Sequence, residues 1–285
     1  MTVLPQDYQS PVENQWCPGC GNFGILEAVR RTLVELQLPP HRVVLCTGIG
    51  QAPKLPHYLR VNTFNGLHGR EVAAATAIKL AAPDLTVMVH AGDGGAYGEG
   101  GNHLLHAIRR NPDLTVVVHD NKVYGLTKGQ ASPTTAQGAP AKIHPRGVPS
   151  RALNPLALAI SQGCSFVAQG MSARIDALVG LLKAAILHRG FSLVNVLQPC
   201  VSWDKLHTYA YYQEHCRELP PDHDPTDALA ALRIALEEGE HHPLGVLYRR
   251  EAPTFEDQAL AHLDRPLRDL PVEPEAAAQL FARLQ

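Results

Sequence analysis

The sequence is poor in the features that would assign it to a membrane, a nucleic acid or a secretory route. It contains no apolar run of the roughly eighteen residues that a membrane-spanning helix needs. Charged residues make up only 18% of the chain, and 25 basic residues nearly balance 27 acidic ones, so composition favours neither nucleic acid nor an anionic membrane as a partner. The N-terminal stretch M-T-V-L-P-Q-D-Y-Q-S lacks the basic and apolar regions of a signal peptide. We therefore expect a cytoplasmic protein.

Cysteine is sparse, with six in the chain. In a reducing compartment structural disulfides are rare, and a lone cysteine is usually a small buried apolar residue. Cys17 and Cys20 differ, because the stretch W-C-P-G-C-G places two thiols where both can bind one metal or cluster. A redox dithiol would open a helix after a strand, and no strand is predicted before Trp16. The favoured interpretation is a metal or cluster site.

Helical patterns alternate along the chain with short apolar runs rich in β-branched residues. Apolar residues at helical spacing predict helices at 22–37, 69–80, 102–110, 172–188, 226–238 and 274–284. The apolar runs predict buried strands at 42–46, 85–90, 114–119, 191–197 and 244–248. This alternation indicates an α/β fold, with a mostly parallel central sheet and helices on both faces. We expect one domain over residues 1–285, and a functional role for the long irregular stretch 125–152.

Polar residues follow two of the predicted strands. The first strand leads into A-G-D-G-G-A-Y-G-E-G-G, and the second ends in H-D-N-K-V-Y-G. Asp93 and Asn121 should therefore lie at the same edge of the sheet, on adjacent strands, where open α/β sheets bind ligands. Carboxylate and carbonyl oxygens suit Mg²⁺, which would bridge the protein to a diphosphate. A helix that starts near Glu99 would point its N-terminus at the same phosphates.

G-D-G followed by one βα unit and then Asn resembles the diphosphate-binding motif of thiamine-diphosphate enzymes. That resemblance implies Mg²⁺ held by Asp93, Asn121 and the backbone carbonyl of Val123. The similarity extends over residues 10–250, leaving 251–285 as a C-terminal extension. It rests on W-C-P-G-C-G-N-F-G-I, T-G-I-G, L-H-G-R, A-T-A-I-K-L-A-x-P-D-L, G-D-G, D-N-x-V-Y-G-L-T-K-G-Q-x-S-P-T-T and Q-P-C. Taken in this order, the motifs resemble the β subunit of 2-oxoacid:ferredoxin oxidoreductases.

The resemblance implies the thiamine-diphosphate-binding fold and a reversible, coenzyme A-dependent oxidative decarboxylation of a 2-oxoacid. Electrons would pass through a 4Fe–4S cluster to ferredoxin. An α subunit would complete the cofactor site and supply the acid that activates the aminopyrimidine, so Glu71 is not expected in that role and the β chain alone should be inactive. The residues implied to contact thiamine diphosphate are Gly48, Ile49, His68, Gly92, Asp93, Gly94, Gly95, Asn121, Val123, Gly125, Leu126 and Thr127.

The substrate is suggested by two lysines. By the resemblance, Lys54 and Lys128 lie near the reactive end of the cofactor and act in catalysis together with His68. Each lysine can bind a carboxylate, and pyruvate has no second carboxylate to occupy both. This favours 2-oxoglutarate, converted to succinyl-CoA and CO₂. Pyruvate, or a broad range of 2-oxoacids, remains the alternative.

The cluster motif departs from the family at one position. In the family the cluster uses both cysteines of C-x-G-C, a third in G-I-G-C and a fourth in P-C. Cys17, Cys20 and Cys200 match three of these, but residue 51 is glutamine. We expect a 4Fe–4S cluster on the three cysteines, with Cys46 or a non-cysteine group near Gln51 as fourth ligand. Loss of the cluster would point to a non-oxidative thiamine-diphosphate decarboxylase subunit. A non-catalytic assembly protein is a further alternative, against which the intact Asp93 and Asn121 argue.

Overall fold

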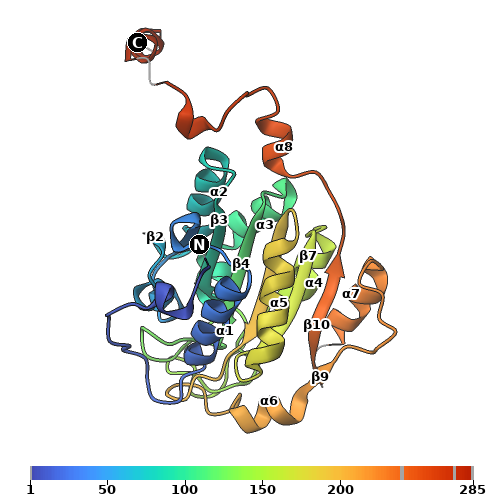
Figure 1. Ribbon diagram of the computed structural model, residues 1–285. Coiled ribbons are helices and arrows are strands. Elements are labelled where there is room, and N and C mark those ends of the chain that lie inside the picture. The colour runs from blue at the N-terminus through green and yellow to red at the C-terminus, as the bar shows by residue number, and fades with distance from the viewer. Residues whose placement is uncertain (1, 238–240, 272–273, 284–285) are drawn as a thin grey trace.

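The computed structural model describes residues 2–237, 241–271 and 274–283. Its centre is an eight-stranded sheet with the order β2-β1-β3-β4-β8-β7-β10-β9 (Figure 1). The strands are β1 (Val43–Thr47), β2 (Asn62–Asn65), β3 (Thr86–Gly92), β4 (Leu114–Asp120), β7 (Phe166–Met171), β8 (Phe191–Leu197), β9 (Cys216–Glu218) and β10 (His242–Arg249). A separate two-stranded hairpin is formed by β5 (Val123–Tyr124) and β6 (Gln130–Ala131).

The sheet is mostly parallel. Within it, β10 runs antiparallel to β7, and the other neighbouring strands pair in parallel. The central strands β4 and β8 are buried along their whole length, which is why their sequences are continuously apolar rather than alternating. The predicted α/β fold with a mostly parallel sheet is confirmed.

Helices cover both faces of the sheet. The face covered by α1 and α5, which lie side by side in Figure 1, buries one apolar cluster, and α2, α3, α4 and α7 lie against a second cluster on the other face. Alternate residues of a strand point to opposite faces, so Val43 and Leu45 of β1 join the first cluster while Val44 and Cys46 join the second. The helices are α1 (Asn22–Glu35), α2 (Glu71–Ala81), α3 (Gly101–Arg110), α4 (Pro155–Ser161), α5 (Ile175–Leu187), α6 (Tyr209–His215), α7 (Ala228–Leu236), α8 (Phe255–Ala259) and α9 (Pro274–Ala282).

The sequence analysis missed β2, β5, β6, β7, β9, α4, α6 and α8, and three of these show why. The edge strand β2 reads N-T-F-N and is exposed throughout, so it lacks an apolar run. In β7, the apolar run is interrupted by Gln169 and Gly170, and α4 has only seven residues. Predicted helix ends differ from the observed ones by a few residues, as helix ends commonly do. Residue 238 of one predicted helix and residue 284 of another lie outside the described residues.

The chain beyond β10 runs back along the amino end of the sheet. In Figure 1, α8 lies above β7 and β10, and the following segment leads past α2 to α9. Arg268 forms an ion pair with Asp84, which follows α2. Along the described part of the chain, no helix combines the length and apolar character needed to cross a membrane.

Candidate functional site

The carboxyl ends of the parallel strands bring distant parts of the chain together. Asp93 directly follows β3, Asn121 follows β4, and Cys200 lies three residues after β8. In the sheet, β3 pairs with β4 and β4 with β8, so these positions lie along one edge. The segment that contains Cys17 and Cys20 reaches this edge because it leads into the N-terminus of α1. Two neighbouring cavities open there.

The larger of the two, which we call the cofactor cavity, has a volume of about 560 Å³, within the range of small-molecule sites. Most of the predicted cofactor-binding residues line it: Ile49, His68, Gly92, Asp93, Gly94, Gly95, Asn121, Val123, Gly125, Leu126 and Thr127. Gly48 does not line the cavity. Nor do Lys54 and Lys128, although Pro53 and Thr127, their neighbours in the chain, do. The structure thus assembles the predicted diphosphate region but leaves the two lysines outside the cavity wall.

Asp93 is fully enclosed and held by two hydroxyl groups. Its Oδ2 accepts hydrogen bonds from Ser132 and, at 2.6 Å, from Thr134. Burial, and next the nearby Asp120, raise the pKa of Asp93. A buried carboxylate next to another acid is stabilised by a bound cation, so its position suits a divalent metal.

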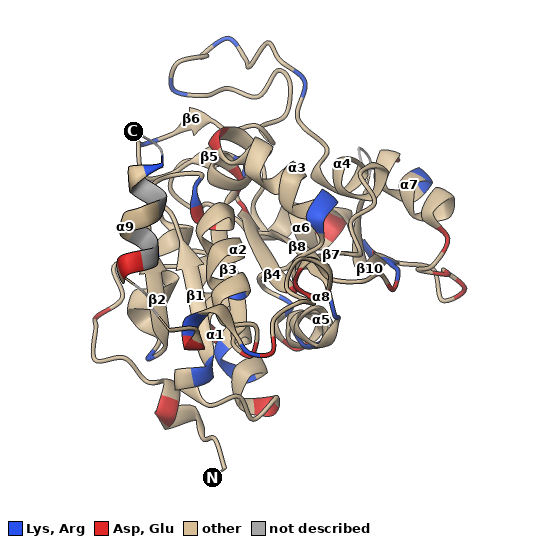
Figure 2. Ribbon diagram, turned by 90° about the horizontal axis from the view of Figure 1, so that it is seen from above, with Lys and Arg blue, Asp and Glu red and all other residues tan. Residues whose placement is uncertain are grey.

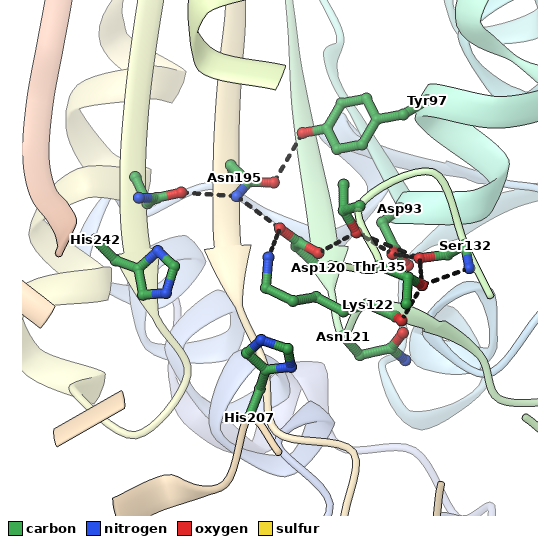
Figure 3. A network of polar contacts seen from close by, with 12 residues as sticks. Asp93, Tyr97, Asp120, Asn121, Lys122, Ser132, Thr135, Asn195, His207 and His242 are labelled. Atoms are coloured by element: carbon green, nitrogen blue, oxygen red, sulfur yellow. Dashed lines mark hydrogen bonds and ion pairs between the residues drawn. The ribbon is translucent and has the colours of Figure 1, made fainter. Parts of the chain in front are cut away.

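A polar network behind Asp93 fixes its position (Figure 3). Thr134 also lies 2.8 Å from Asp120, which accepts a further hydrogen bond from Asn195 at 3.3 Å. Tyr97 donates to Asn195 at 2.8 Å. The network spans β4, β8 and the long loop after β6, and it ties the loop hydroxyls to the end of the sheet. Sequence reasoning assigned no role to Ser132 or Thr134; the S-P-T-T stretch was the available signal.

Asn121 sits in a tight turn at the same edge. Its Oδ1 accepts a hydrogen bond from the backbone N–H of Val123 at 3.1 Å, and the intervening Lys122 has a left-handed backbone with φ of 59°. This turn brings Asn121 and Val123 to the cavity wall together. Their oxygens and the carboxylate of Asp93 form an all-oxygen donor set, which is the type that Mg²⁺ prefers. The predicted donors therefore fit a magnesium ion.

The glycine-rich turn after β3 differs from its predicted form. A π-helix at Gly94–Glu99 precedes α3, so helical structure begins beside Asp93 rather than near Glu99. A Cβ at Gly94 would lie 2.2 Å from the ring of Tyr124, whereas one at Gly92 would meet no atom within 4 Å. Packing therefore requires a glycine at 94, while Gly92 leaves open space. The open space beside Gly92 would allow a phosphate group to come close to the backbone.

His68 is held by hydrogen bonds on both sides of its ring. Its Nδ1 lies 2.7 Å from the carbonyl oxygen of Ile49 and its Nε2 lies 3.0 Å from Glu99. Because a carbonyl oxygen only accepts, Nδ1 carries a proton. Tyr124 donates a hydrogen bond to the same Glu99 at 3.1 Å. Sequence reasoning did not include Glu99 and Tyr124 among the cavity residues, although both lie in the motifs that follow β3 and β4, because only the fold brings them to His68.

Glu71 is buried directly behind the cofactor cavity. Its side chain is enclosed, Oε2 has no hydrogen-bond partner in the described structure, and burial raises its pKa. A Cβ on Gly48 would lie 2.5 Å from Oε2, and one on Gly95 would lie 3.0 Å from Oε1. Glu71 does not line the cavity itself. Glu71 therefore packs behind the cavity wall without forming part of it.

The second cavity contains the three predicted cluster cysteines, and we call it the cysteine cavity. It is lined by Trp16, Cys17, Cys20, Asn22, Gln51, Asn121, Gly125, Gln198, Cys200, Val201, Ser202 and Trp203. Hydrogen-bond donors surround the sulfur atoms. Ser202 donates to Cys17 at 3.1 Å, Gln198 donates to Cys20 at 3.5 Å, and the backbone N–H of Asn22 also bonds to Cys20. Donors of this kind stabilise metal-bound thiolates and tune a cluster.

The pKa of Cys20 argues against a redox dithiol. Burial, with smaller contributions from the nearby Cys200 and Cys17, raises the pKa of Cys20 to about 11. Reactive dithiols require the opposite, a lowered thiol pKa. In the described part of the chain, no group of three His, Cys, Asp or Glu converges on a single-ion position. The cavity is compatible with a multi-iron cluster, in which each cysteine sulfur binds a different iron atom.

Cys46 is not brought to the cysteine cavity. It lies in β1, is fully buried, and packs with Val44 and Val72 on the α2 face of the sheet. Trp16 and Cys20 pack on the opposite face, where α1 lies. Strand alternation therefore directs the Cys46 side chain away from the other cysteines, which removes its suitability as fourth ligand.

A buried chain of polar side chains leads from the sheet to the cysteine cavity. His90 on β3 lies 3.0 Å from His119 on β4, and His119 lies 2.7 Å from Oδ1 of Asn22. The amide oxygen only accepts, so Nδ1 of His119 is protonated, and its Nε2 accepts from His90. This orientation leaves Nδ2 of Asn22 buried without a partner among the described residues, in a residue that lines the cavity.

The buried His90 should make the protein sensitive to acid. Burial lowers its pKa from 6.5 to about 3, so between these values the unfolded chain binds a proton that the folded one does not. Stability should then fall by up to about 1.4 kcal/mol for each pH unit below about 6.5, levelling off near the folded pKa. Urea unfolding between pH 7.5 and 4.5 measures this slope, which should be smaller in His90→Gln. The exposed His41→Gln serves as control, and equal slopes in all three proteins would contradict the prediction.

Two models of known protein families match successive parts of the chain. The family model described as thiamine pyrophosphate enzyme, C-terminal TPP binding domain, matches residues 46–196, and the model of the C-terminal part of the pyruvate ferredoxin oxidoreductase β subunit matches residues 200–263. The β subunit of 2-oxoacid:ferredoxin oxidoreductase from a Sulfolobus species is 43% identical over 267 residues, which cover 89% of this chain and 88% of that subunit. This chain belongs to the β subunits of the 2-oxoacid:ferredoxin oxidoreductases.

Two further proteins that this β subunit resembles are named for 2-oxoglutarate. The solved structure of 2-oxoglutarate:ferredoxin oxidoreductase from Magnetococcus marinus, with 2-oxoglutarate, coenzyme A and succinyl-CoA bound, is similar with a TM-score of 0.90 and 36% identity, covering 98% of this chain and 96% of that one. The KorB subunit of 2-oxoglutarate oxidoreductase from Mycobacterium tuberculosis is 43% identical over 68% of this chain and 52% of that subunit. The predicted family and its thiamine-diphosphate-binding fold are confirmed. Being a β subunit, the chain implies an α partner.

Proposed function

We propose that this β subunit, joined to its α subunit, catalyses the coenzyme A-dependent oxidative decarboxylation of 2-oxoglutarate to succinyl-CoA and CO₂. The reaction is reversible, and electrons leave through a 4Fe–4S cluster to ferredoxin. The observation that carries the proposal is the wall shared by the two cavities: Gln51, Asn121 and Gly125 line both. A decarboxylation site and an electron-accepting site are thus immediate neighbours. The relatives named for 2-oxoglutarate support the choice of substrate.

In this proposal the edge of the sheet holds the diphosphate of the cofactor. Asp93, the side chain of Asn121 and the backbone carbonyl of Val123 bind Mg²⁺, and Ser132 and Thr134 keep Asp93 in place by their hydrogen bonds. Thiamine diphosphate supplies the electron sink for loss of CO₂. His68 is fixed by the carbonyl oxygen of Ile49 and by Glu99, and it orients the Glu99 carboxylate at the cavity wall.

Cys17, Cys20 and Cys200 hold the cluster. Their sulfurs share a cavity with Asn22 and Gln198, whose N–H groups bond to Cys20. Thiolates are the preferred ligands of cluster iron, and donors to sulfur adjust the reduction potential. The residues therefore fit a cluster that accepts electrons from the neighbouring cavity.

The long loop after β6 supports a substrate with two carboxylates. Residues 132–154 contain three basic residues, Lys142, Arg146 and Arg151, and neither Asp nor Glu. Figure 2 shows this loop extending beyond the sheet, with blue segments and no red ones. One of its residues, Ile143, lines the cofactor cavity. A basic loop beside the cavity attracts an anionic substrate and suits 2-oxoglutarate better than pyruvate.

Lys128 provides a test of substrate choice. It is exposed, follows Thr127 in the cavity wall, and forms no ion pair within the described structure. If it binds the distal carboxylate, Lys128→Ala should raise the KM for 2-oxoglutarate by about tenfold or more, with the KM for pyruvate little changed. Steady-state kinetics of the αβ complex measure both. Lys183→Ala, on the far helix α5, is the control, and equal effects of Lys128→Ala on the two substrates would remove the dicarboxylate argument. The same kinetics should be repeated with Lys54→Ala.

The proposed reaction is tested with the purified αβ complex and a low-potential acceptor. We expect 2-oxoglutarate and coenzyme A together to reduce ferredoxin, and either alone to give little reduction. Release of CO₂ without reduction of the acceptor would support a non-oxidative decarboxylase subunit instead. Absence of any thermal stabilisation by thiamine diphosphate with Mg²⁺ would support a non-catalytic assembly protein.

A further inference from the structure

One residue that lines the cysteine cavity has a buried side-chain oxygen without a hydrogen-bond partner among the described residues. Gln51 lines the cavity together with Cys17, Cys20 and Cys200. Its Oε1 is buried and has no hydrogen-bond partner among the described residues. A buried amide oxygen without a partner destabilises the folded protein by on the order of 1–3 kcal/mol. A metal ion bound to this oxygen would offset that free energy.

The backbone of Gln51 is anchored to the segment that carries the first two cysteines. Its carbonyl oxygen accepts a hydrogen bond from the indole N–H of Trp16 at 2.8 Å, and another from the backbone N–H of Lys54 at 3.3 Å. Trp16 immediately precedes Cys17 in the chain. Residue 51 also caps the 3-10 helix Ala52–Tyr58. The position of residue 51 relative to the C-P-G-C segment is therefore fixed on two sides.

The other groups that line the cavity are less suited to the same role. Cys46 lies on the opposite face of the sheet. The side chain of Asn121 is assigned to Mg²⁺ under the proposed function, and it also lines the cofactor cavity. The amide of Gln198 is already engaged through its N–H group with Cys20, although its oxygen is also unpaired. Among the described residues that line the cavity, Gln51 has an unpaired amide oxygen and no side-chain hydrogen bond to a cysteine.

We infer that Oε1 of Gln51 coordinates the fourth iron of the cluster held by Cys17, Cys20 and Cys200. The inference rests on the cluster assigned under the proposed function. A neutral oxygen replaces an anionic thiolate, so the cluster carries one negative charge fewer and its reduction potential is higher than that of a four-cysteine cluster. Oxygen binds cluster iron more weakly than sulfur does, so this iron is the first to leave on oxidation. Because Gln51 also lines the cofactor cavity, the labile iron lies at the wall between the two cavities.

Gln51→Cys in the anaerobically purified αβ complex tests the inference without relying on turnover. Iron and sulfide are counted before and after brief treatment with ferricyanide, and the potential is measured by EPR-monitored redox titration. We expect the wild-type complex to lose about one iron in four and to develop the signal of a three-iron cluster. Gln51→Cys should keep all its iron under the same treatment and show a lower potential. Gln51→Ala should lose iron faster than wild type.

Two matched variants identify which group is responsible. Gln198→Leu removes the other unpaired amide oxygen of the cavity together with a donor to Cys20, so its potential should shift, but it should still lose about one iron in four on oxidation. Cys46→Ala should also behave as wild type. Unchanged potential and iron loss in Gln51→Cys, or stabilised iron only in a Gln198 or Cys46 variant, would overturn the inference while leaving the cluster in place. A wild-type complex that binds no iron after reconstitution would overturn both the inference and the proposed cluster.

Discussion

Asp93→Asn should lower the activity of the αβ complex by on the order of 100-fold or more, and should abolish its stabilisation by thiamine diphosphate with Mg²⁺. The amide removes the negative charge that binds the metal but keeps the shape of the side chain. Ser132 and Thr134 can still donate to its oxygen. Thermal unfolding with and without cofactor measures the loss. In wild type, cofactor at one hundred times its dissociation constant should contribute about 2.7 kcal/mol.

The same variant has a second expected signature that separates loss of binding from misfolding. Burial and Asp120 raise the pKa of Asp93, which means that the fold disfavours its charged form. Removing that charge should therefore leave the cofactor-free protein as stable as wild type or more stable at neutral pH. The exposed Asp222→Asn is the control and should retain both activity and the cofactor-induced shift. A cofactor-induced shift of wild-type size in Asp93→Asn would reject the assignment of this residue.

Cys20→Ser should remove the iron–sulfur cluster and with it all reduction of ferredoxin. Among the three cysteines proposed to hold the cluster, this one is the most engaged, because it accepts hydrogen bonds from Gln198 and from the backbone of Asn22. A serine hydroxyl is a poor ligand for cluster iron. Iron content should fall from about four per chain to less than about one. Iron analysis and EPR of the reduced complex provide the measurement.

Thiamine diphosphate binding distinguishes a specific loss of the cluster from general damage. Because the cofactor cavity does not include Cys20, Cys20→Ser should keep the thermal shift given by cofactor and Mg²⁺. Cys164→Ser is the matched control, since this thiol is buried elsewhere and donates to the carbonyl of Phe166, a contact that serine reproduces. Normal iron content in Cys20→Ser, or its loss in Cys164→Ser, would contradict the assignment.

The fold was predictable where burial is uniform. The strands β1, β3, β4 and β8 are nearly continuous apolar runs because helices cover both of their faces. The edge strand β2 escaped prediction because it is exposed. The π-helix after β3 also escaped, since a glycine-rich stretch carries no periodicity and its geometry is set by packing of Gly94 against Tyr124.

Site residues were predictable when they directly follow a buried strand. Asp93 and Asn121 come directly after β3 and β4, so strand order alone brings them to one edge. Lys54 and Lys128 were predicted by similarity of motif, and the structure places both outside the cavity wall. The roles of the predicted site residues stay predictions that the experiments above address.

By itself, the sequence determined the family, the parallel α/β fold and the residues that follow its central strands, because these depend on residue type and spacing along the chain. Only the tertiary structure decided which groups meet across long separations in sequence. It joined Cys17 and Cys20 to Cys200 in one cavity, and placed Gln51 there. It turned Cys46 to the opposite face, since alternation along β1 directs that side chain toward α2. Such placement depends on which face of a strand each residue occupies, and the short separation of Cys46 from Gln51 in sequence does not reveal it.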